Sequence, residues 1–438
     1  MKGKMRFIAL LLTVVMTMGL LAGCGKKDAG DANNDKSDQK KTEDQAKKED
    51  QGQTGETVTI EWWTPNWDEK ESREMVEEFT AKNPNIKVNL VITEWDTYKS
   101  KITAAISTKN APQLYTVLTT DVAQFAKLGL LSPLNDLGAQ AGINFDDSLK
   151  AALEICTVDG KVYGIPFRHD GSGVWYNIDM LKAAGYDAFP TTWNELNELS
   201  AKLVENGIIE YAHAWPLGNQ ANAVTRLVQQ LYSNNGNVLS ADEKECLLDS
   251  PEAIQALTNI CDTLVKGYAS PSSLEMDNTI LRDTFGAGKL AFYIGGPFDA
   301  STLETEYPDL NFASAVIPGK DGMGCTTSNG WTICLAENTE NKEAAALFLQ
   351  YLTLPENQAR LTDSFPASYT AIEYEQFSTD NLKPFAAQLE NSKPEPAYAQ
   401  WAEMEPIIFN YMQYALSGTM TPEDACKAMK TDIDAILN

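Results

Sequence analysis

The chain has 438 residues, and 43% of them are hydrophobic, so it can bury a large core. This length exceeds that of one ordinary domain and predicts two compact units. With 61 acidic against 35 basic residues, the formal net charge of -26 repels nucleic-acid backbones and anionic lipid headgroups alike. The composition therefore argues against nucleic acid as a partner.

The first residues have the pattern of an export signal. Lys2, Lys4 and Arg6 precede an apolar run over residues 7–21, which ends in small residues. A membrane-spanning helix needs roughly 20 apolar residues, so this run is short for a permanent transmembrane anchor, which is the alternative interpretation. We expect residues 1–23 to be a signal peptide.

A cysteine follows this run directly. The sequence Leu21-Ala22-Gly23-Cys24 resembles the lipobox of bacterial lipoproteins, and the resemblance implies that Cys24 becomes a lipid-modified N-terminus at the cell membrane. Residues 25–57 contain almost no large apolar side chains and cannot bury enough surface to offset chain entropy. The sequence therefore predicts a disordered tether over residues 24–57, anchored through the lipid on Cys24.

The folded part begins with an α/β pattern. Residues 58–62 alternate between apolar and polar side chains, as in a strand. A helix with Met75 and Phe79 on one face follows, ends before Pro84, and leads to a second alternating strand over residues 86–92. This order of elements is typical of a parallel sheet.

Further elements continue the alternation. We expect a helix near residues 97–109, a strand over residues 114–119, a helix from Asp121 to Gly129, and a strand over residues 208–212. Two later helices have marked N-termini, because Thr192 and Glu195 fit a capping box and Thr421 precedes a proline.

Six cysteines lie in the predicted folded part: Cys156, Cys246, Cys261, Cys325, Cys334 and Cys426. Export permits disulfides, but the spacings are long and irregular, and a chain of this size needs no covalent cross-links. No C-x-x-C pair occurs, which argues against a metal site or a thioredoxin-like function. The pattern favours buried free thiols over three disulfides.

Several short segments of the folded part carry a resemblance to one family of proteins. They are Ile60-Glu61-Trp62-Trp63, residues 125–131, residues 160–166, Trp175-Tyr176-Asn177, residues 190–196, residues 285–292, Gly295-Gly296-Pro297-Phe298 and Asn329-Gly330-Trp331. In this order and spacing they resemble the extracellular solute-binding proteins of carbohydrate importers, the group that includes maltose- and maltodextrin-binding proteins. The resemblance covers residues 58–438.

The resemblance implies an α/β fold of the type II periplasmic-binding-protein kind, in which two hinged lobes close over a ligand. Matching segments place lobe 1 at residues 58–168 plus 331–378 and lobe 2 at residues 169–330 plus 379–438. It also implies a carbohydrate ligand, expected to be an oligosaccharide, and delivery to the permease subunits of an ABC transporter. The protein is then an extracytoplasmic, lipid-anchored monomer that needs no cofactor or metal.

A sugar site needs flat aromatic rings against the C–H face of the sugar. The resemblance places Phe298 at the family's Gly-Pro-Trp turn and Trp401 at a pocket position, while Trp63 ends the first strand. Trp215 lies in a predicted loop after the strand at residues 208–212, where function is favoured. Burial in the core is the alternative for each ring, because large aromatic side chains are usually buried.

Carboxylates are the expected partners of the sugar hydroxyls. Asp121 follows a strand end, where the family places a hydroxyl-binding Asp, and Asp170 precedes Asn177 in the position of a carboxylate beside the hinge. Asp121 also opens a helix, so helix capping is an equal alternative. Glu94, near the end of the second strand, is a further candidate.

Two positions depart from the maltodextrin pattern: Leu118 stands where that group has a stacking Trp, and Phe298 replaces the Trp of the turn. Fewer rings imply a shorter or different sugar. Catalysis is the competing class, but His169 and His213 are the only histidines, and the common hydrolase and phosphate-loop motifs are missing from the sequence. A glycosidase needs only two carboxylates. A binding protein for another small solute and a sensory receptor are the remaining alternatives.

Overall fold

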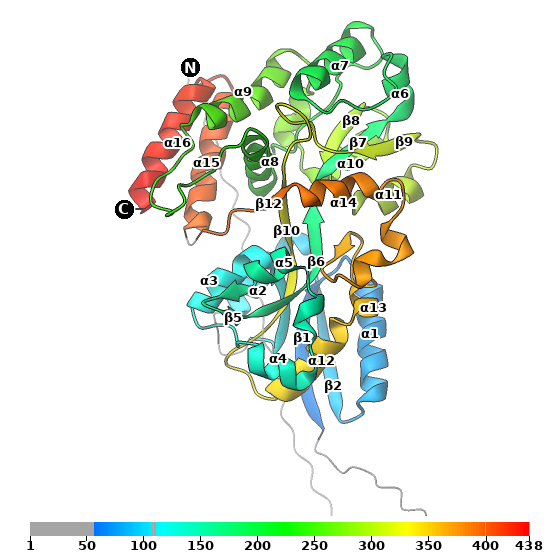
Figure 1. The fold of residues 1–438 in the computed structure, drawn as a ribbon, viewed down its shortest axis with the longest axis vertical. Coiled ribbons are helices and arrows are strands. Elements are labelled where there is room, and N and C mark those ends of the chain that lie inside the picture. Colours follow the sequence, from blue (N-terminus) through cyan, green and yellow to red (C-terminus); the bar gives the residue numbers. More distant parts are fainter. Residues whose placement is uncertain (1–56, 107, 109–110, 399, 438) are drawn as a thin grey trace, which may run out of the picture. The chain divides into compact units, whose positions relative to one another are not determined.

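The computed structural model of the protein describes residues 57–106, 108, 111–398 and 400–437. These residues belong to one compact unit (Figure 1). The predicted signal peptide, the lipid site Cys24 and the tether up to residue 56 lie outside the described residues. Among the helices that the structure describes, none is long and apolar enough to cross a membrane.

The strands and helices alternate along most of the chain. The strands are β1 (Val58–Pro65), β2 (Ile86–Thr93), β3 (Leu114–Leu118), β4 (Thr157–Val158), β5 (Lys161–Val162), β6 (Gly164–Gly171), β7 (Gly173–Asn177), β8 (Phe292–Gly295), β9 (Phe312–Ala315), β10 (Thr326–Leu335), β11 (Phe365–Pro366) and β12 (Ser392–Pro394). The first helices are α1 (Glu69–Lys82), α2 (Trp95–Ile106), the 3-10 turn η1 (Thr119–Asp121), α3 (Val122–Lys127), α4 (Asn135–Ala141), α5 (Lys150–Ile155), α6 (Ile178–Ala183), α7 (Trp193–Glu205) and α8 (Gln220–Ser233). The others are α9 (Pro251–Val265), α10 (Asn278–Gly286), α11 (Asp299–Glu306), α12 (Lys342–Leu352), α13 (Pro355–Gln358), α14 (Lys383–Glu390), α15 (Trp401–Leu416) and α16 (Pro422–Leu437).

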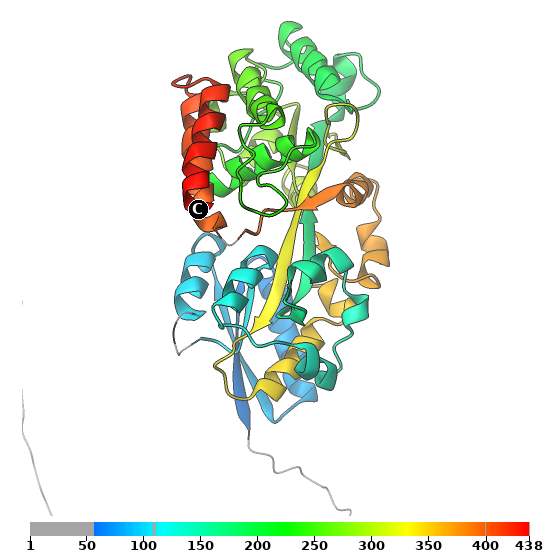
Figure 2. The ribbon, with the colours of Figure 1, turned by 60° about the vertical axis from the view of Figure 1, so that its left-hand side comes forward.

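Two main sheets organise these elements. The larger has the strand order β11-β6-β10-β3-β1-β2, with β12 paired to β10, and the smaller has the order β8-β7-β9. The predicted parallel pairing holds for β1 with β2 and β3, and β10 is also parallel to β12, but β10 runs antiparallel to β3 and to β6. The larger sheet is therefore mixed. Two of its strands connect it to the smaller sheet: β6 leads into β7, and β10 returns the chain after β9 (Figure 2).

The predicted lobe boundaries at residues 168/169 and 330/331 fall within the continuous strands β6 and β10. Each sheet has its own hydrophobic core. Trp62 and Phe348 lie in the core of the larger sheet, while helices α8, α9, α15 and α16 bury a second core together with Val174 and Phe292 of the smaller sheet. The exact division into lobes stays a prediction.

Several predicted elements form for the expected reasons. Met75 and Phe79 are buried under α1, and Thr192 with Glu195 makes the complete capping box of α7. The Thr421 hydroxyl accepts a hydrogen bond from the Asp424 amide at 3.1 Å and starts α16. Local sequence therefore sets these helix ends.

The strand predicted over residues 208–212 is wrong. The chain reverses after α7 at Gly207, which has a φ of 65°, and the Ile208 amide donates back to the Leu203 carbonyl at 3.0 Å. Ile208 and Ile209 thus belong to the end of a helix. Only His213 forms a β-bridge in this region, to Ala269.

All six cysteines of the described part are free and buried, which confirms the preference for thiols over disulfides. Burial raises the pKa of Cys156 to about 12 and the pKa of Cys261 to about 11. These thiols stay protonated at neutral pH and serve as small apolar groups of the core.

Candidate functional site

The candidate site is centred on Arg168, a 6% exposed side chain near the end of β6. Its Nε donates to both carboxylate oxygens of Asp170, at 3.0 and 2.8 Å, and one terminal nitrogen donates to Asp363 at 2.5 Å. Burial alone lowers the pKa of Arg168, but Asp170 and Asp363 outweigh it and the pKa rises. The guanidinium is therefore a fixed positive charge in an acidic setting.

Two aromatic rings lie close to this guanidinium. Its central carbon is 5.5 Å from the ring centre of Trp67 and 5.3 Å from that of Phe298. Trp67 follows β1 of the larger sheet, whereas Phe298 lies in the turn after β8 of the smaller sheet. Arg168 thus marks a place where segments from the two sheets meet.

Local backbone features set the positions of these groups. A Cβ at Gly330 of β10 would come within 2.2 Å of the Arg168 carbonyl oxygen, so only glycine permits the strands to approach here. A Cβ at Gly296 would come within 2.1 Å of the Phe298 ring, which folds back over this glycine. On the other side, Trp331 contacts Trp67 edge to face, with ring centres 4.7 Å apart.

Two further carboxyl groups, each next in the chain to one of these rings, have raised pKa values. Burial raises the pKa of Asp68 to about 8, and Asp363 adds to the rise while Arg168 opposes it. Burial also raises the pKa of Asp299 to about 6, although the Tyr293 hydroxyl donates to it at 2.9 Å. At neutral pH Asp68 is a largely protonated acid that can donate as well as accept a hydrogen bond.

A second charged group lies around Asp121. Lys99 of α2 is 3.6 Å from the Asp121 carboxylate. Burial raises the pKa of Asp121, with Lys99 opposing the rise and Glu395 adding to it. Glu395 accepts hydrogen bonds from Thr225 of α8 and Asn329 of β10, each at 2.7 Å. Acidic groups therefore face one another on this side too.

The predicted site residues do not all lie together in the structure. Asp170 and Phe298 lie together at Arg168, and Asp121 lies in the second charged group. Trp401 is partly buried at the start of α15, where its ring centre is 6.2 Å from that of Tyr398. One turn further on, burial raises the pKa of Glu405, and the charges of Lys99 and Asp121 act on it. The start of α15 therefore faces the Asp121 group.

Two predicted residues have local partners. The Trp63 indole donates to Glu61 at 2.6 Å, and the ring packs beside the core between β1 and α2. Glu94 accepts a hydrogen bond at 2.7 Å from Asn66, the residue before Trp67. Glu94 is thus linked to the Arg168 site through the neighbour of Trp67, whereas the indole of Trp63 bonds to a residue of its own strand. As for Asp121, its side chain makes no capping hydrogen bond to α3, so the capping alternative has no support.

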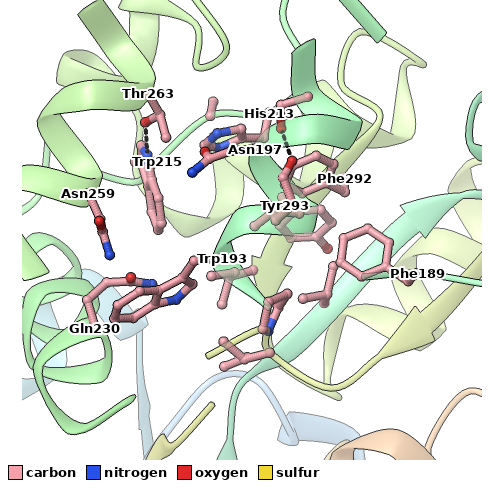
Figure 3. Close-up of a pocket in the computed structure, with 17 residues that line it drawn as sticks. Phe189, Trp193, Asn197, His213, Trp215, Gln230, Asn259, Thr263, Phe292 and Tyr293 are labelled. Carbon is pink, nitrogen blue, oxygen red and sulfur yellow. Dashed lines mark hydrogen bonds between the residues drawn. The ribbon is translucent and has the colours of Figure 1, made fainter. Parts of the chain in front are cut away.

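Trp215 lies apart from the other predicted residues. It is 7% exposed in the core of α8 and α9, and its indole donates to the Thr263 hydroxyl at 2.9 Å (Figure 3). The neighbouring cavity, which His213 also lines, has a volume of about 40 Å³. Such a cavity holds one or two water molecules, whereas ligand pockets start at roughly 300 Å³. The structure thus favours the core-packing alternative for this ring.

The sequence interpretation missed Trp67, Asp68, Arg168 and Asp363. The first two come shortly after β1, and side chains after the carboxyl ends of parallel strands often form sites, which is a signal in the sequence. Arg168 and Asp363 are 195 residues apart in the chain, and no local pattern connects them. Within the described residues no cluster of His, Cys, Asp or Glu side chains could hold a metal ion.

Comparisons with known proteins agree with this architecture. The model of the family described as bacterial extracellular solute-binding protein matches residues 65–359. A protein of Brucella abortus (strain 2308) named as a binding protein is 25% identical over 376 residues, covering 83% of this chain and 89% of the relative.

Two solved structures have the same fold. The sugar-binding protein MalE from Xanthomonas citri is 22% identical with a TM-score of 0.76, covering 87% of this chain and 97% of that one. UgpB from Mycobacterium tuberculosis, in complex with glycerophosphocholine, is 20% identical with a TM-score of 0.76 and coverages of 87% and 98%. The fold is thus α/β and two-lobed, of the type II periplasmic-binding-protein kind, as the sequence predicted.

Proposed function

The chain belongs to the family of bacterial extracellular solute-binding proteins, and from this premise we propose that it captures a carbohydrate and delivers it to the permease of an ABC transporter. The family and the fold are those of binding proteins rather than enzymes, and they imply an extracytoplasmic location. We further propose that the protein is a monomer held at the outer face of the cell membrane by a lipid on Cys24.

The observation that carries the carbohydrate proposal is the pair of rings at Arg168. Trp67 and Phe298 come from segments that follow strands of different sheets, and each ring reaches the same side chain. A pyranose presents C–H faces that stack on such rings and hydroxyls that bond to planar acids. Asp68 and Asp170 supply these acids within the same site. This combination suits a sugar.

The charge of the site favours a neutral ligand over a phosphate ester. Asp68, Asp170 and Asp363 all act on Arg168, whose guanidinium already pairs with Asp170 and Asp363. An anionic ligand therefore meets acidic groups around a guanidinium that is already paired. Glycerophosphocholine, the ligand of the solved relative, contains a phosphate diester, so we propose a different ligand class for this chain.

Binding is proposed to act through closure of the two lobes, with residues 58–168 plus 331–378 moving against residues 169–330 plus 379–438. A ligand that contacts Trp67 and Asp121 on one lobe and Phe298 and Trp401 on the other stabilises the closed state. Trp63, Glu94, Asp170 and Trp215 complete the set predicted from the sequence, although the burial of Trp215 gives it the least support. The closed form is then the state that the permease receives.

Titration of the exported chain with a panel of mono- and oligosaccharides, followed by tryptophan fluorescence and calorimetry, tests this proposal. We expect one sugar class to bind and the double variant Trp67→Ala with Phe298→Ala to abolish binding at the Arg168 site. Tyr414→Ala is the matched control, because Tyr414 is 47% exposed on α15 and contacts only Tyr411 among aromatic rings of the described part. If no sugar binds, while glycerophosphodiesters or peptides do, the carbohydrate assignment is contradicted.

A further inference from the structure

A polar depression lies elsewhere on the protein, at the start of α7, the end of α8 and the start of α9. Its volume is about 420 Å³, and the turn between β9 and β10 closes one side. The lining residues are Trp193, Asn194, Asn197, Asn234, Pro251, Glu252, Gln255, Asn259, Lys320 and Asp321. None of them belongs to the Arg168 site, so the depression is a separate feature.

Three polar atoms of these residues have no hydrogen-bond partner among the described residues: Trp193 Nε1, Asn234 Oδ1 and Asn259 Nδ2. Asn234 is only 4% exposed, and its other amide atom is held by a bond to the Glu252 carbonyl at 3.0 Å. Similarly, Asn259 Oδ1 accepts from Gln255 at 2.8 Å, which fixes the direction of the free Nδ2 group. Buried polar atoms without a partner are costly, so each of them calls for an external partner.

The depression adjoins the small cavity beside Trp215, because Trp193, Asn197 and Asn259 line both. Figure 3 shows Trp193, Gln230 and Asn259 gathered at one side of that cavity, with the Asn259 amide directed toward the other two. The unpaired donors of Trp193 and Asn259 therefore lie at the boundary between a small inner cavity and an open outer depression.

The lining chemistry defines the ligand class. Side-chain amides dominate it, and an amide both donates and accepts hydrogen bonds, as the neighbouring hydroxyls of a sugar do. Glu252 and Asp321 are partly balanced by Lys320, so no strong charge selects an ion. The volume lies within the range of small-molecule pockets, roughly 300 to 1,000 Å³. We propose that this depression is a second binding site, which takes a single sugar unit or a neutral polyol of similar size.

This proposal goes beyond the function assigned to the Arg168 site, and one experiment tests both independently. The chain is labelled with fluorotryptophan, and the ¹⁹F resonances of Trp193 and Trp67 are assigned from the variants Trp193→Phe and Trp67→Phe. D-glucose, D-galactose and N-acetyl-D-glucosamine are then titrated up to their solubility. We expect at least one of them to shift the Trp193 resonance in a saturable manner, including in the double variant Trp67→Ala with Phe298→Ala.

Variants in the depression give the matched comparison. Asn259→Leu removes the free donor and is expected to weaken the response at Trp193 about tenfold. Gln255→Ala, at an exposed position, releases the Asn259 amide and is expected to weaken it about threefold while leaving the fold intact. Asn206→Leu is the control, because Asn206 is exposed at the end of α7 and outside the depression.

Each outcome separates the two proposals. A response at Trp193 that persists in the double variant supports the second site, whatever happens at Trp67. A response at Trp67 alone overturns the second site and leaves the proposed function in place. The second site is also overturned if no sugar moves the Trp193 resonance, if the double variant abolishes its shift, or if Asn259→Leu and Gln255→Ala respond like the parent chain.

Discussion

Arg168 and Arg226 are both almost completely buried, at 6% and 4% exposure, yet their surroundings differ. Arg168 pairs with two carboxylates, and its pKa rises. Arg226 of α8 donates to Ser172, Gln229, Asn278 and the Ile294 carbonyl, all neutral groups, and burial lowers its pKa to about 10. The same side chain thus donates hydrogen bonds to carboxylates in one region and to neutral groups in the other.

This difference distinguishes a binding region around Arg168 from a region around Arg226 that stabilises the fold. The buried charges and partly protonated acids around Arg168 lower the stability of the fold, and such destabilising groups are typical of functional sites. Around Arg226, Gln229 adds bonds to the Ser172 and Thr327 hydroxyls at 2.9 and 3.1 Å. Helix α8 is thereby tied to the link between β6 and β7 and to the start of β10, where the chain passes between the sheets. We expect mutations in the two regions to have opposite effects on stability.

The largest effect is expected at Arg226. Arg226→Ala leaves several buried acceptors unpaired and opens a cavity, so the free energy of unfolding should fall by about 4 kcal/mol. Urea denaturation measures this loss. Arg73→Ala is the control, because its pair with Glu69 is 57% exposed on the arginine side and should matter little. If the free energy of unfolding falls as little in Arg226→Ala as in the control, Arg226 does not stabilise the fold.

The opposite sign is expected at Asp68. Its folded pKa of about 8 lies above the unfolded value near 3.9, so between these values the folded state binds more protons and stability falls as pH rises. Asp68→Asn removes this dependence. From pH 5 to pH 7 the parent should lose on the order of 3 kcal/mol relative to the variant.

Denaturation curves of both chains at the two pH values provide the test of this titration. Asp187→Asn, at an exposed position, is the control and should follow the parent. The same Asp68→Asn variant should retain sugar affinity at neutral pH, because an amide donates and accepts hydrogen bonds as the protonated acid does. A difference between parent and variant that does not change with pH shows that Asp68 is ionised in the folded protein.

A smaller effect is expected from the ring in the turn after β8. Phe298→Ala removes one stacking surface and should weaken sugar binding about tenfold while the chain stays folded. Phe298→Trp restores the residue of the Gly-Pro-Trp turn and should retain affinity. Calorimetry with the sugar found in the panel measures both, and equal affinities for the alanine variant and the parent exclude Phe298 from the site.

The sequence predicted the parts of this protein that local signals determine. Caps at Thr192 and Thr421 and the apolar face of α1 were sufficient to locate helices. The ordered segments predicted the two-lobed fold, and they placed Asp170 and Phe298, which lie together at Arg168.

Local sequence patterns did not predict the long-range contacts. The Arg168–Asp363 pair depends on how β6 meets a segment after α13, and neither residue has a distinctive neighbourhood. The strand predicted at residues 208–212 failed because Gly207 reverses the chain and Ile208 binds back to α7. Apolar residues in a short run can serve a helix end as well as a strand, and only tertiary structure decides between them.

The smallest effect is expected at Trp215, where stability and sugar affinity should respond differently. Trp215→Phe keeps most of the ring but removes the indole donor to Thr263, whose hydroxyl still donates to the Ile260 carbonyl at 2.8 Å. The free energy of unfolding should therefore fall by about 1 kcal/mol, and sugar affinity should not change. Affinity at the Arg168 site and thermal unfolding of the same sample measure the two effects. A tenfold loss of affinity with unchanged stability would place Trp215 in the ligand site, as its position in a loop first suggested.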